Sequence, residues 1–570
     1  MIRINELRLP LNHAEDALRP AALARLQLAD AELAGIHIAR RGYDARKKSD
    51  IQLVYTLDCT LADGVDEAAL LARFAADHQI RATPDTGYHF LAQFGNGRGD
   101  YTGPRPVVVG FGPCGLFAAL ILAQMGLRPI VLERGKAVRE RTQDTWGLWR
   151  EQRLDPESNV QFGEGGAGTF SDGKLYSQIS DPRHLTRKVL TEFVKAGAPE
   201  EILFVSKPHI GTFRLVSMII RMRADIEALG GEIRFQQKMT DLLIEGGAVR
   251  GVQLESGEQI ATSHVVIALG HSARDTFQML HARGVQMEAK PFSIGYRIEH
   301  PQSLVDAARF GPNAGNPILG AADYKLVHHA KNGRSVYSFC MCPGGTVVAA
   351  TSEPERVVTN GMSQYSRNER NANAGIVVGL TPEDYRQDGR RDGSPVNPLD
   401  GMAFQRLWES RAYELGGGGY LAPGSLVGDF IKRQVSKAFG DVQPSYKPGV
   451  TLTNLQQKDR GSLPRYCLDA IREALPAFAR QIRGFDRPDA VLTGVETRTS
   501  SPLRINRGRD YQSVNVRGLF PAGEGAGYVG GIMSAGVDGI EVAEALAADL
   551  LGLPDAAVLQ GKGAKAGGQT

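Results

Sequence analysis

A glycine-rich turn between a strand and a helix is the feature that most constrains how this chain can fold. Residues 104–135 read PRPVVVGFGPCGLFAALILAQMGLRPIVLERG. The β-branched run at 106–109 predicts a buried parallel strand, and the apolar run at 116–125 predicts a helix. A second strand is predicted at 129–132, and Glu133 follows it directly. The stretch therefore predicts a strand, a glycine turn, a helix and a second strand in one βαβ unit.

Gly110, Gly112 and Gly115 give the turn the G-x-G-x-x-G pattern of dinucleotide-binding sites. The first glycine permits a tight turn, the second lets the backbone approach a pyrophosphate, and the third lets helix and strand pack closely. The helix N-terminus offers free N–H groups and partial positive charge to phosphates. Glu133 can accept hydrogen bonds from ribose hydroxyls, and the alternative is a glycine turn that binds nothing. The candidate site also includes the neighbouring residues Pro113, Cys114 and Arg134.

The composition indicates a soluble globular protein with several domains. The chain has 570 residues, of which 42% are hydrophobic and 23% are charged. Its net charge of +3 gives no general argument for a nucleic acid or membrane partner. Five irregularly spaced cysteines make no disulfide framework or metal site and fit a reducing cytosol. No secretory signal is visible, and the apolar window at 107–126 is interpreted as buried core rather than a membrane span.

Residues 1–100 are predicted to form a separate ferredoxin-like α/β module. The expected element order is β-α-β-β-α, beginning with an edge strand at 1–9. The turn between the second and third strands contains Arg40, Arg41, Arg46, Lys47 and Lys48. Over the whole module, however, 12 Lys and Arg residues stand against 14 Asp and Glu residues. We therefore interpret the basic turn as a solvated hairpin, expect no nucleic acid partner, and assign 94–106 as a linker.

Two later regions extend the glycine-turn unit. The segment 159–175 reads NVQFGEGGAGTFSDGKL, and its glycine density predicts an irregular loop close to a ligand. Residues 232–270 predict a strand, a three-stranded meander and a further strand that stops at Gly270. The dinucleotide-binding domain is therefore expected to begin with residues 104–280.

The rest of the chain is predicted to contain an insertion and then a return to the first fold. Residues 281–485 show no second nucleotide-binding pattern and are interpreted as an inserted substrate domain. Strands at 490–493 and 519–524, a glycine-rich turn and a helix at 531–551 are assigned to the returning part, 486–553. The tail at 554–570 is predicted to be disordered.

Three separated segments, 106–133, 232–270 and 518–546, together resemble the glutathione-reductase-like class of FAD proteins. The stretch GLFPAGEGAGYVGGIMSAGVDG looks like the second flavin motif of that class, with Glu524 in place of the more common Asp. The motifs FGEGGAGTFSDGKL, KPHIGT, ALGHSARDTF, KPFSIGYRIEHPQ, CMCPGG and GVETRTSSPLRI resemble a bacterial family of uncharacterised FAD-dependent (NAD(FAD)-utilising) dehydrogenases. This resemblance covers nearly the whole chain. It implies an α/β fold with an FAD-binding Rossmann domain, an inserted α+β substrate domain and the N-terminal module.

The resemblance also implies where non-covalently bound FAD would lie. The loop after residue 162 would pass beside the flavin, and a backbone pair at Met239 would hold the adenine. Glu524 would hold the ribityl chain, and the final helix would point its N-terminus at the pyrimidine end of the flavin. The further cofactor-binding candidates are Gly165, Gly166, Ala167, Gly168, Thr169, Met239, Gly270, Gly523, Glu524, Gly530, Gly531 and Ile532.

The catalytic residues remain open at this level. The candidates are His209, Lys174, Glu496, Arg504, Cys340 and Cys342. Lys174 or Arg504 could bind an anionic substrate, and His209 or Glu496 could act as an acid or base, but each such residue is more often a hydrogen-bonded structural one. In an extended strand, the two sulfurs of the Cys-x-Cys pair would lie roughly 6–7 Å apart, too far for a disulfide without a turn. The favoured interpretation of the pair is two small residues that line a flavin pocket; the alternative is a redox role, with the turn supplied by Pro343-Gly344-Gly345.

These observations favour a cytoplasmic FAD-dependent oxidoreductase that exchanges hydride or electrons with an unidentified small organic molecule. Since no second dinucleotide domain is visible, NAD(P)H would bind only transiently at the flavin face. One alternative is an RNA-associated flavoprotein, such as a tRNA-modifying enzyme, that binds RNA through residues 1–100. Another is a non-catalytic redox sensor that binds FAD. The sequence does not indicate the oligomeric state.

Overall fold

A five-stranded parallel sheet carries the glycine-rich turn. The structure, a computed structural model, describes residues 1–95, 100–390 and 392–553. The strands, in sheet order, are β23 (Leu519–Pro521), β11 (Val265–Ile267), β5 (Val107–Val109), β6 (Ile130–Glu133) and β7 (Glu232–Phe235). All neighbours in this sheet are parallel, and α3 (Pro113–Gln124) joins β5 to β6. The predicted βαβ unit is therefore confirmed.

Both faces of the parallel sheet are covered, which explains the unbroken valine run of β5. Val108 packs into a buried cluster of helices, whereas Val107 and Val109 pack against a β-meander on the opposite face. The helices are α3, α5 (Leu185–Lys195), α6 (Thr212–Ala228) and α13 (Ile532–Leu550). The meander strands are β8 (Met239–Glu245), β9 (Ala248–Leu254) and β10 (Gln259–Ala261). The predicted meander is confirmed.

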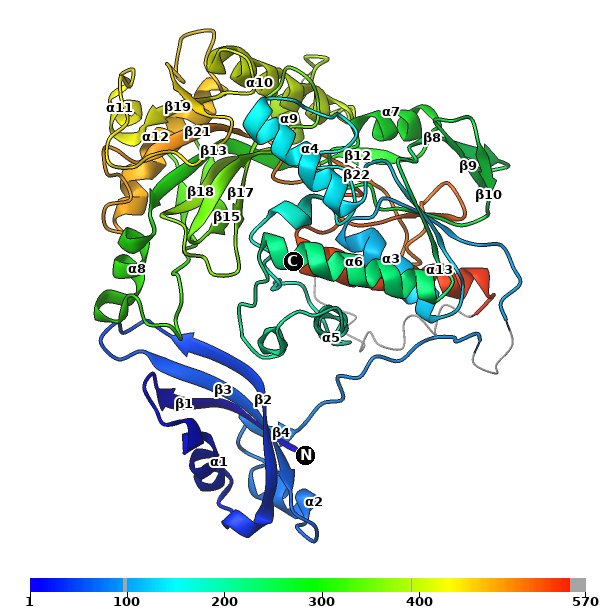
Figure 1. The fold of residues 1–570 in the computed structure, drawn as a ribbon, viewed down its shortest axis with the longest axis vertical. Coiled ribbons are helices and arrows are strands. Elements are labelled where there is room, and N and C mark those ends of the chain that lie inside the picture. The colour runs from blue at the N-terminus through cyan, green and yellow to red at the C-terminus, as the bar shows by residue number, and fades with distance from the viewer. Residues whose placement is uncertain (96–99, 391, 554–570) are drawn as a thin grey trace.

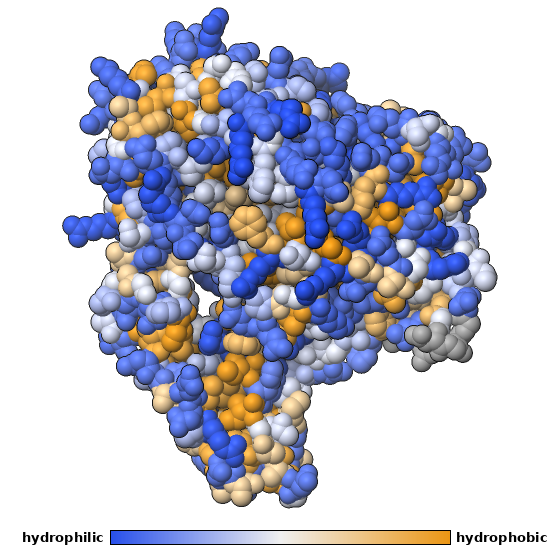
Figure 2. Space-filling view, in the orientation of Figure 1, coloured by the Kyte–Doolittle hydropathy of each residue, from blue (hydrophilic) through white to orange (hydrophobic). Residues whose placement is uncertain are grey.

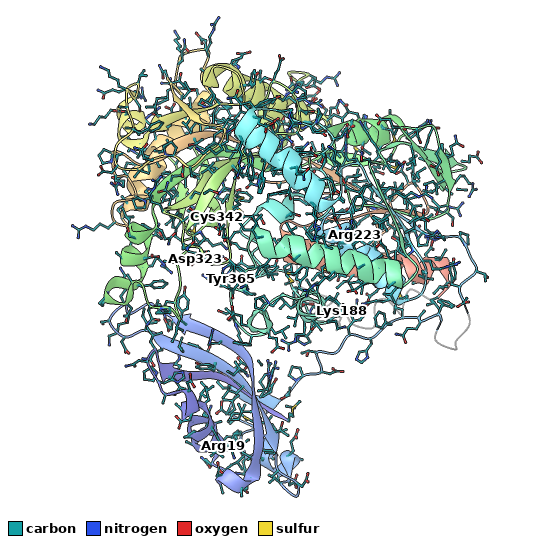
Figure 3. The ribbon with its side chains drawn as sticks, in the orientation of Figure 1. Arg19, Lys188, Arg223, Asp323, Cys342 and Tyr365 are labelled. Carbon is teal, nitrogen blue, oxygen red and sulfur yellow. The ribbon has the colours of Figure 1, made fainter. Side chains whose placement is uncertain are left out.

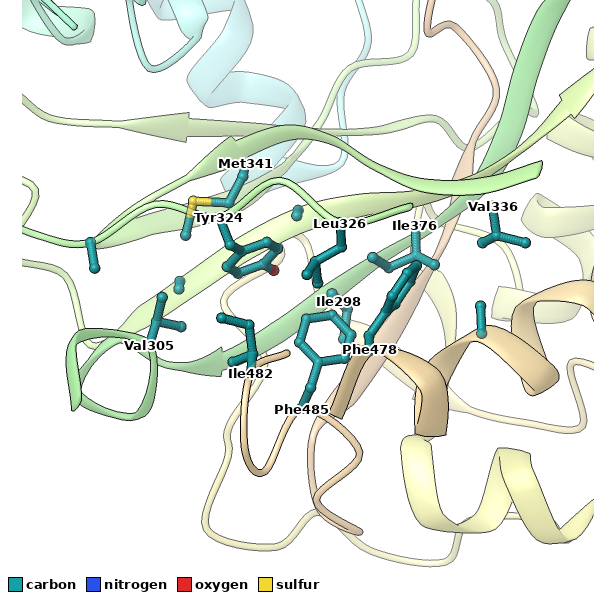
Figure 4. Close-up of a cluster of buried hydrophobic side chains, with 14 of the residues drawn as sticks. Ile298, Val305, Tyr324, Leu326, Val336, Met341, Ile376, Phe478, Ile482 and Phe485 are labelled. Atoms are coloured by element: carbon teal, nitrogen blue, oxygen red, sulfur yellow. The ribbon is translucent and has the colours of Figure 1, made fainter. Parts of the chain in front are cut away.

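A seven-stranded sheet forms the second large part of the molecule (Figure 1). Its strands, in sheet order, are β14 (Val327–His329), β15 (Ser335–Cys342), β18 (Asn371–Leu380), β13 (Phe292–Pro301), β21 (Val491–Glu496), β19 (Ala422–Leu426) and β20 (Val450–Leu452). Helix α12 (Arg465–Ala479) packs on this sheet, and Phe478 and nearby Phe485 lie against Ile298, Ile376 and Tyr324 (Figure 4).

Strand β21, the last strand of that sheet in chain order, corrects one sequence assignment. The strand predicted at 490–493 was expected to return to the dinucleotide-binding fold. Instead, β21 pairs with β13 and β19, so this assignment is wrong. An isolated strand carries no sequence signal for its sheet partner, because pairing is decided by tertiary contacts. The chain rejoins the parallel sheet only at β23.

The N-terminal module has the β-α-β-β-α-β order of ferredoxin-like proteins. Its elements are β1 (Ile2–Pro10), α1 (Leu18–Leu26), β2 (Leu33–Asp44), β3 (Gln52–Leu61), α2 (Glu67–Arg73) and β4 (Ile80–Ala82). The sheet order is β2-β3-β1-β4, so β1 has a partner on both sides. The prediction of an edge strand at 1–9 is therefore wrong, because the three-residue β4 was too short to recognise.

The remaining helices and strands surround the two large sheets (Figure 1). The helices are α4 (Val138–Glu151), α7 (Arg274–Ala282), α8 (Gln302–Phe310), α9 (Pro382–Tyr385), α10 (Asp400–Gly416) and α11 (Val427–Lys432). The strands form the pairs β12 (Met287–Ala289) with β22 (Leu503–Ile505) and β16 (Gly345–Ala349) with β17 (Thr359–Ser363). Short 3-10 helices lie at Glu15–Ala17, Asp30–Glu32, Ala167–Phe170, Glu200–Leu203 and Gly311–Asn313.

Within the described residues, each helix is too short or too polar to cross a bilayer. The predicted disordered tail at 554–570 and part of the predicted linker lie outside the described residues.

Candidate cofactor-binding site

A long cavity runs along the carboxyl ends of the parallel strands. It encloses about 1490 Å³, including space open to solvent at its mouth. Its wall includes Val109 at the end of β5, Glu133 at the end of β6 and Ala268 just after β11. In open α/β sheets, ligands bind outside the carboxyl ends of the strands. The cavity therefore lies where a dinucleotide site is expected.

Most of the predicted cofactor-binding residues meet at this cavity. The wall contains Gly110, Gly112, Pro113, Cys114, Glu133, Arg134, Gly166, Ala167, Gly168, Met239, Gly270, Gly523, Glu524, Gly531 and Ile532. Two catalytic candidates, Lys174 and Cys340, line it as well. Among the described residues, the wall leaves out Gly115, Gly165, Thr169, Gly530, Cys342, His209, Glu496 and Arg504. Segments that are far apart in the chain thus converge on one cavity.

The two ends of the cavity differ in construction. We call the part formed by residues 110–114, Glu133 and Met239 the glycine end. We call the part formed by residues 171–174, Phe339, Cys340 and Asn360 the thiol end.

At the glycine end, the glycines perform the tasks that their spacing predicts. Gly110 has φ +98, and a Cβ on it would lie 2.4 Å from Ala268 O. A Cβ on Gly115 would lie 2.0 Å from Gly110 O, so only glycine lets α3 pack this closely against the turn. A Cβ on Gly166 would lie 2.8 Å from the Cα of Gly112, so two glycine backbones meet in the cavity wall. Gly115 therefore acts through packing, which explains why it does not line the cavity.

Glu133 is held in place by backbone donors. Its buried carboxylate accepts hydrogen bonds from Phe111 N at 2.9 Å, Gly135 N at 2.8 Å and Gly163 N at 2.9 Å. Three donors stabilise an ionised carboxylate without a cationic partner. The same acid thus ties the glycine turn to the 159–175 loop and presents oxygen acceptors to the cavity.

Two helices point their N-termini at the cavity. α3 begins after Gly112 and α13 after Gly531, and neither N-cap residue supplies a side-chain hydrogen bond. The first N–H groups of a helix need partners and carry partial positive charge. Cβ atoms placed on Gly530 and Gly531 would meet nothing within 4 Å, so the approach to α13 is open. The arrangement suits a ligand with negative charge at two separated positions.

Arg141 fixes the glycine-rich loop through hydrogen bonds, and it is not among the residues predicted from the sequence. This fully buried α4 side chain donates to the carbonyl oxygens of Asn159, Val160 and Glu164 at 2.6–2.7 Å. It also donates to Gly166 O at 2.9 Å. An irregular buried loop needs hydrogen-bond donors for its carbonyl groups. In the sequence, this need is the only indication that a buried donor such as Arg141 must be present. Nothing in the amphipathic pattern of α4 distinguishes Arg141 from an exposed arginine.

At the thiol end, a β-bulge reshapes strand β15. Phe339 pairs with Gly375 and Cys342 pairs with Asn373, so one extra residue lies between the two pairs. Cys340 has φ +41, and its half-buried side chain lines the cavity. The ammonium group of Lys174 donates to Met341 O. The bulge therefore turns Cys340 toward the cavity, a change of direction that a regular strand would not allow.

Charged groups surround the thiol end. Arg297 is fully buried and forms an ion pair with Glu496, at 2.6 Å from Nε to Oε2. Its Nη1 also donates to Cys340 O at 2.8 Å. Glu496 thus serves as the partner of a buried arginine, and burial raises its pKa. Asp172 pairs with Arg367, with Nε 2.9 Å from Oδ1.

The remaining catalytic candidates lie elsewhere. His209 stacks on Tyr365 with ring centroids 5.3 Å apart, and burial lowers its pKa. Arg504 is partly exposed on β22 and pairs with Glu288 at 3.1 Å. Of the predicted acid, base and anion-binding residues, Lys174 lines the cavity and pairs with His209 in an isolated β-bridge, whereas Arg504 lies apart from them.

His209 lines a second cavity at the junction with the N-terminal module, where Figure 2 shows an opening. We call it the junction cavity; its wall combines Arg41 and Tyr43 of β2 with Tyr365 and Arg367. Because Asp172 lines the cofactor cavity and Arg367 the junction cavity, their ion pair lies between the two.

Two of the five basic residues in the hairpin of the N-terminal module, Arg46 and Lys47, form ion pairs. Arg46 pairs with Asp44, which also accepts from Arg8 at 2.9 Å. Lys47 lies 3.5 Å from Asp50.

Several further wall residues were not predicted: Gln161, Phe162, His271, Ser272, Asn360 and Arg498. His271 Nδ1 lies 3.2 Å from Glu524 Oε1, while its buried Nε2 has no hydrogen-bond partner among the described residues. A buried polar atom without a partner in a cavity wall suits a polar ligand. Arg498 is anchored by a 2.9 Å ion pair with Glu409, which also pairs with Arg274. All but Asn360 lie within segments that the sequence analysis singled out, but their individual roles depend on distant partners such as Glu524 and Glu409.

Comparison with known proteins adds family information. Residues 291–499 match the family described as FAD-dependent protein, C-terminal domain-like, and residues 1–60 match a domain of unknown function, DUF8436. Over 551 residues the chain is 45% identical to an uncharacterized protein of Clostridium beijerinckii, an alignment that covers 95% of this chain and 98% of that protein.

The structure of the chain is also similar to solved structures at low sequence identity. It matches a triple mutant of flavin-dependent brominase Bmp2 at 13% identity and a TM-score of 0.34, covering 80% of this chain and 83% of that one. A geranylgeranyl bacteriochlorophyll reductase-like protein of Thermoplasma acidophilum gives 12% identity, a TM-score of 0.35 and coverages of 80% and 82%. Likeness at this level carries no conclusion about reaction or substrate.

Proposed function

Because this chain belongs to the family of the Clostridium beijerinckii protein, and carries the C-terminal domain of FAD-dependent proteins, we propose that it is an FAD-dependent oxidoreductase. In this proposal FAD binds non-covalently along the long cavity and exchanges hydride or electrons with a small organic molecule. The ADP part of FAD lies at the glycine end, and the flavin lies at the thiol end. NADH or NADPH would approach the flavin only transiently.

The convergence of separated segments on one cavity is the observation that carries the proposal. Gly112, Glu133 and Met239 line the glycine end, and Gly531 comes from the C-terminal part of the chain. Two helix N-termini without side-chain caps face the same space. A dinucleotide carries a pyrophosphate, two sugars and two ring systems, and this wall offers a site for each kind of group.

The residues of the wall have separate tasks in binding. The N–H groups at the start of α3 would bind the pyrophosphate, and the fixed Glu133 carboxylate would accept from ribose hydroxyls. Glu524 and His271 contact each other in the cavity wall and would offer polar partners to the hydroxylated chain of the cofactor. The start of α13 would stabilise negative charge on a bound ring. FAD itself supplies the two-electron chemistry.

The proposal is tested by identifying the bound cofactor. Protein purified without added flavin should show a flavin absorbance spectrum, and heat denaturation should release FAD that chromatography separates from FMN. Absence of FAD after purification and after reconstitution with excess FAD would contradict the proposal. Gly35→Ala should retain FAD as the wild type does and serves as the control for variants of the cavity, because a Cβ at Gly35 would meet only Thr60 Cβ at 4.0 Å.

A second measurement addresses the reaction. The FAD-loaded protein is mixed anaerobically with NADH, NADPH or a panel of metabolites, and bleaching of the flavin is followed. Reduction by any of them supports an oxidoreductase. Failure with all of them, in a protein whose FAD dithionite reduces, would favour the redox-sensor alternative.

A further inference from the structure

Two cysteines, separated by one residue, lie at the thiol end of the cavity. Cys340 lines the cavity, and Cys342 is buried directly behind it. The Cys342 thiol donates a hydrogen bond to the backbone oxygen of Cys340, with Sγ 3.3 Å from O, so its sulfur lies beside the residue that lines the cavity. Both thiols are free in the structure. Figure 3 shows Cys342 in the interior, between the seven-stranded sheet and the helices of the parallel sheet.

The β-bulge in β15 explains this proximity. Met341, between the two cysteines, has its side chain in the hydrophobic cluster of Figure 4, close to Tyr324. Met341 is buried in the core, and Cys340, directly before it, has a left-handed φ, so the strand is not extended between the two cysteines. A bulge of this kind re-aims a side chain beside a functional site. The extended-strand estimate of 6–7 Å between the sulfurs therefore does not apply here.

The charges around the pair favour a thiolate on Cys340. The groups that face it are Cys342 on its own strand, Lys174 and Asp172 from the glycine-rich loop, Arg297 on β13 and Glu496 on β21. The hydrogen bond from the Cys342 thiol and the two cations lower the pKa of Cys340, while burial and Asp172 oppose them. The pKa of Cys342 is raised by the hydrogen bond that it gives to Cys340 and by burial. One thiolate and one thiol is the protonation pattern of a reactive cysteine pair.

We propose that Cys340 and Cys342 form a redox-active pair that cycles between dithiol and disulfide and exchanges two electrons with flavin in the same cavity. This inference rests on the proposed function. The Cys340 thiolate and the Cys342 thiol form one S–S bond. They release two electrons and one proton, which the oxidised flavin accepts, so that flavin is reduced as the pair is oxidised.

The pair also defines a substrate class. An external dithiol that enters the cavity attacks the disulfide at Cys340, the cysteine whose side chain reaches the cavity. The attack forms a mixed disulfide and releases the Cys342 thiol. The second thiol of the compound then displaces Cys340, so the compound leaves as a disulfide and the pair returns to the dithiol. The substrate is therefore a small thiol or disulfide compound.

Mass spectrometry tests the disulfide directly. Arg334 and Arg356 are consecutive trypsin sites, so one peptide, residues 335–356, contains both cysteines. Reduced apo-protein is loaded anaerobically with oxidised FAD, quenched with an alkylating agent and digested. We expect this peptide to lose 2 Da and to escape alkylation while the flavin bleaches. Two alkylated cysteines beside a flavin that remains oxidised would overturn the proposal.

Reduction by dithiothreitol tests the route of the electrons. In the FAD-loaded wild type, anaerobic dithiothreitol should bleach the flavin, and Cys340→Ser or Cys342→Ser should slow bleaching at least a hundredfold. Cys59→Ser and Cys467→Ser are matched controls, because these buried cysteines lie outside the wall of the cavity. Equal rates in wild type and both serine variants would overturn the inference, whereas loss of FAD binding in the wild type would overturn the proposed function.

Alkylation at different pH values gives a readout that does not depend on flavin. Cys340 in the apo-protein should react with iodoacetamide at pH 6, where Cys59 does not, since burial raises the pKa of Cys59 to about 11. Lys174→Met should move the pH midpoint of Cys340 alkylation up by at least one unit. A Cys340 midpoint at or above the ordinary thiol value in the wild type would count against the pair.

Discussion

The glycine end and the thiol end belong to the same cavity, yet they are built in opposite ways. At the glycine end, the wall is largely backbone, and its spacing is set by glycines at 110, 112 and 166. At the thiol end, the wall contains side chains with charge and reactivity, among them Lys174 and Cys340. A wall of backbone atoms suits tight binding of a part of the ligand that does not react. A wall of charged and reactive side chains suits the part of the ligand that reacts.

The supports of the two ends differ as well. Gly110, Gly115 and Glu133 lie within a single βαβ unit, and the close approach of Gly115 to Gly110 O lies inside that unit. The thiol end depends on β13, β15 and β21, which meet only in the folded sheet. If this contrast is correct, changes at the glycine end should reduce stability and FAD affinity, and changes at the thiol end should alter reactivity.

The largest effect is expected from Arg141→Met. Removal of the guanidinium leaves several buried carbonyl groups of the 159–166 loop without donors, and the cost should be about 3–5 kcal/mol of unfolding free energy. Urea denaturation measures it. Arg150→Met on the same helix is the control, because Arg150 is exposed and should change stability by less than about 0.5 kcal/mol. Equal effects in both variants would show that the loop does not depend on Arg141.

Gly115→Ala should destabilise the protein by about 3 kcal/mol, since the new Cβ would lie 2.0 Å from Gly110 O. Thermal unfolding should show a matching fall in melting temperature, together with weaker FAD retention. In Gly35→Ala the Cβ meets only Thr60 at 4.0 Å, so this variant should resemble the wild type. A stable, FAD-binding Gly115→Ala protein would break the argument that α3 needs this close approach.

Glu133→Gln should weaken FAD binding at least tenfold and lower stability by about 1–2 kcal/mol, because an amide nitrogen would face backbone donors. Flavin fluorescence quenching during titration measures the affinity. The matched change at the other end, Cys340→Ser, should keep the affinity within about threefold of wild type. Should Cys340→Ser weaken binding as much as Glu133→Gln, the division of tasks between the ends is wrong.

The smallest effect is expected from Glu524→Asp, which introduces the acid that is more common in the resembling class. The shorter arm lengthens the 3.2 Å contact with His271, so FAD affinity should fall by about threefold with little change in stability. The same fluorescence titration detects it. A change of more than tenfold would indicate that Glu524 contributes as much to binding as the glycine end does.

Local patterns in the sequence predicted the glycine end correctly. The G-x-G-x-x-G spacing, the flanking apolar runs and the acid at the end of the second strand all belong to one continuous βαβ unit. The predicted strand at 490–493 existed, but its sheet was wrong, because it pairs with strands more than sixty residues away along the chain. The edge-strand prediction failed for a similar reason, since β4 lies next to β1 only after the module folds.

The sequence by itself determined the βαβ unit, the meander and the residue types around the cavity, since short-range periodicity and glycine spacing encode backbone geometry. Only the tertiary structure decided that Arg141 holds the 159–166 loop, that Arg297 neutralises Glu496, and that a bulge brings Cys340 and Cys342 together. These contacts join residues from separate elements, and the free energy of burying a charge or turning a strand depends on neighbours that no local pattern names.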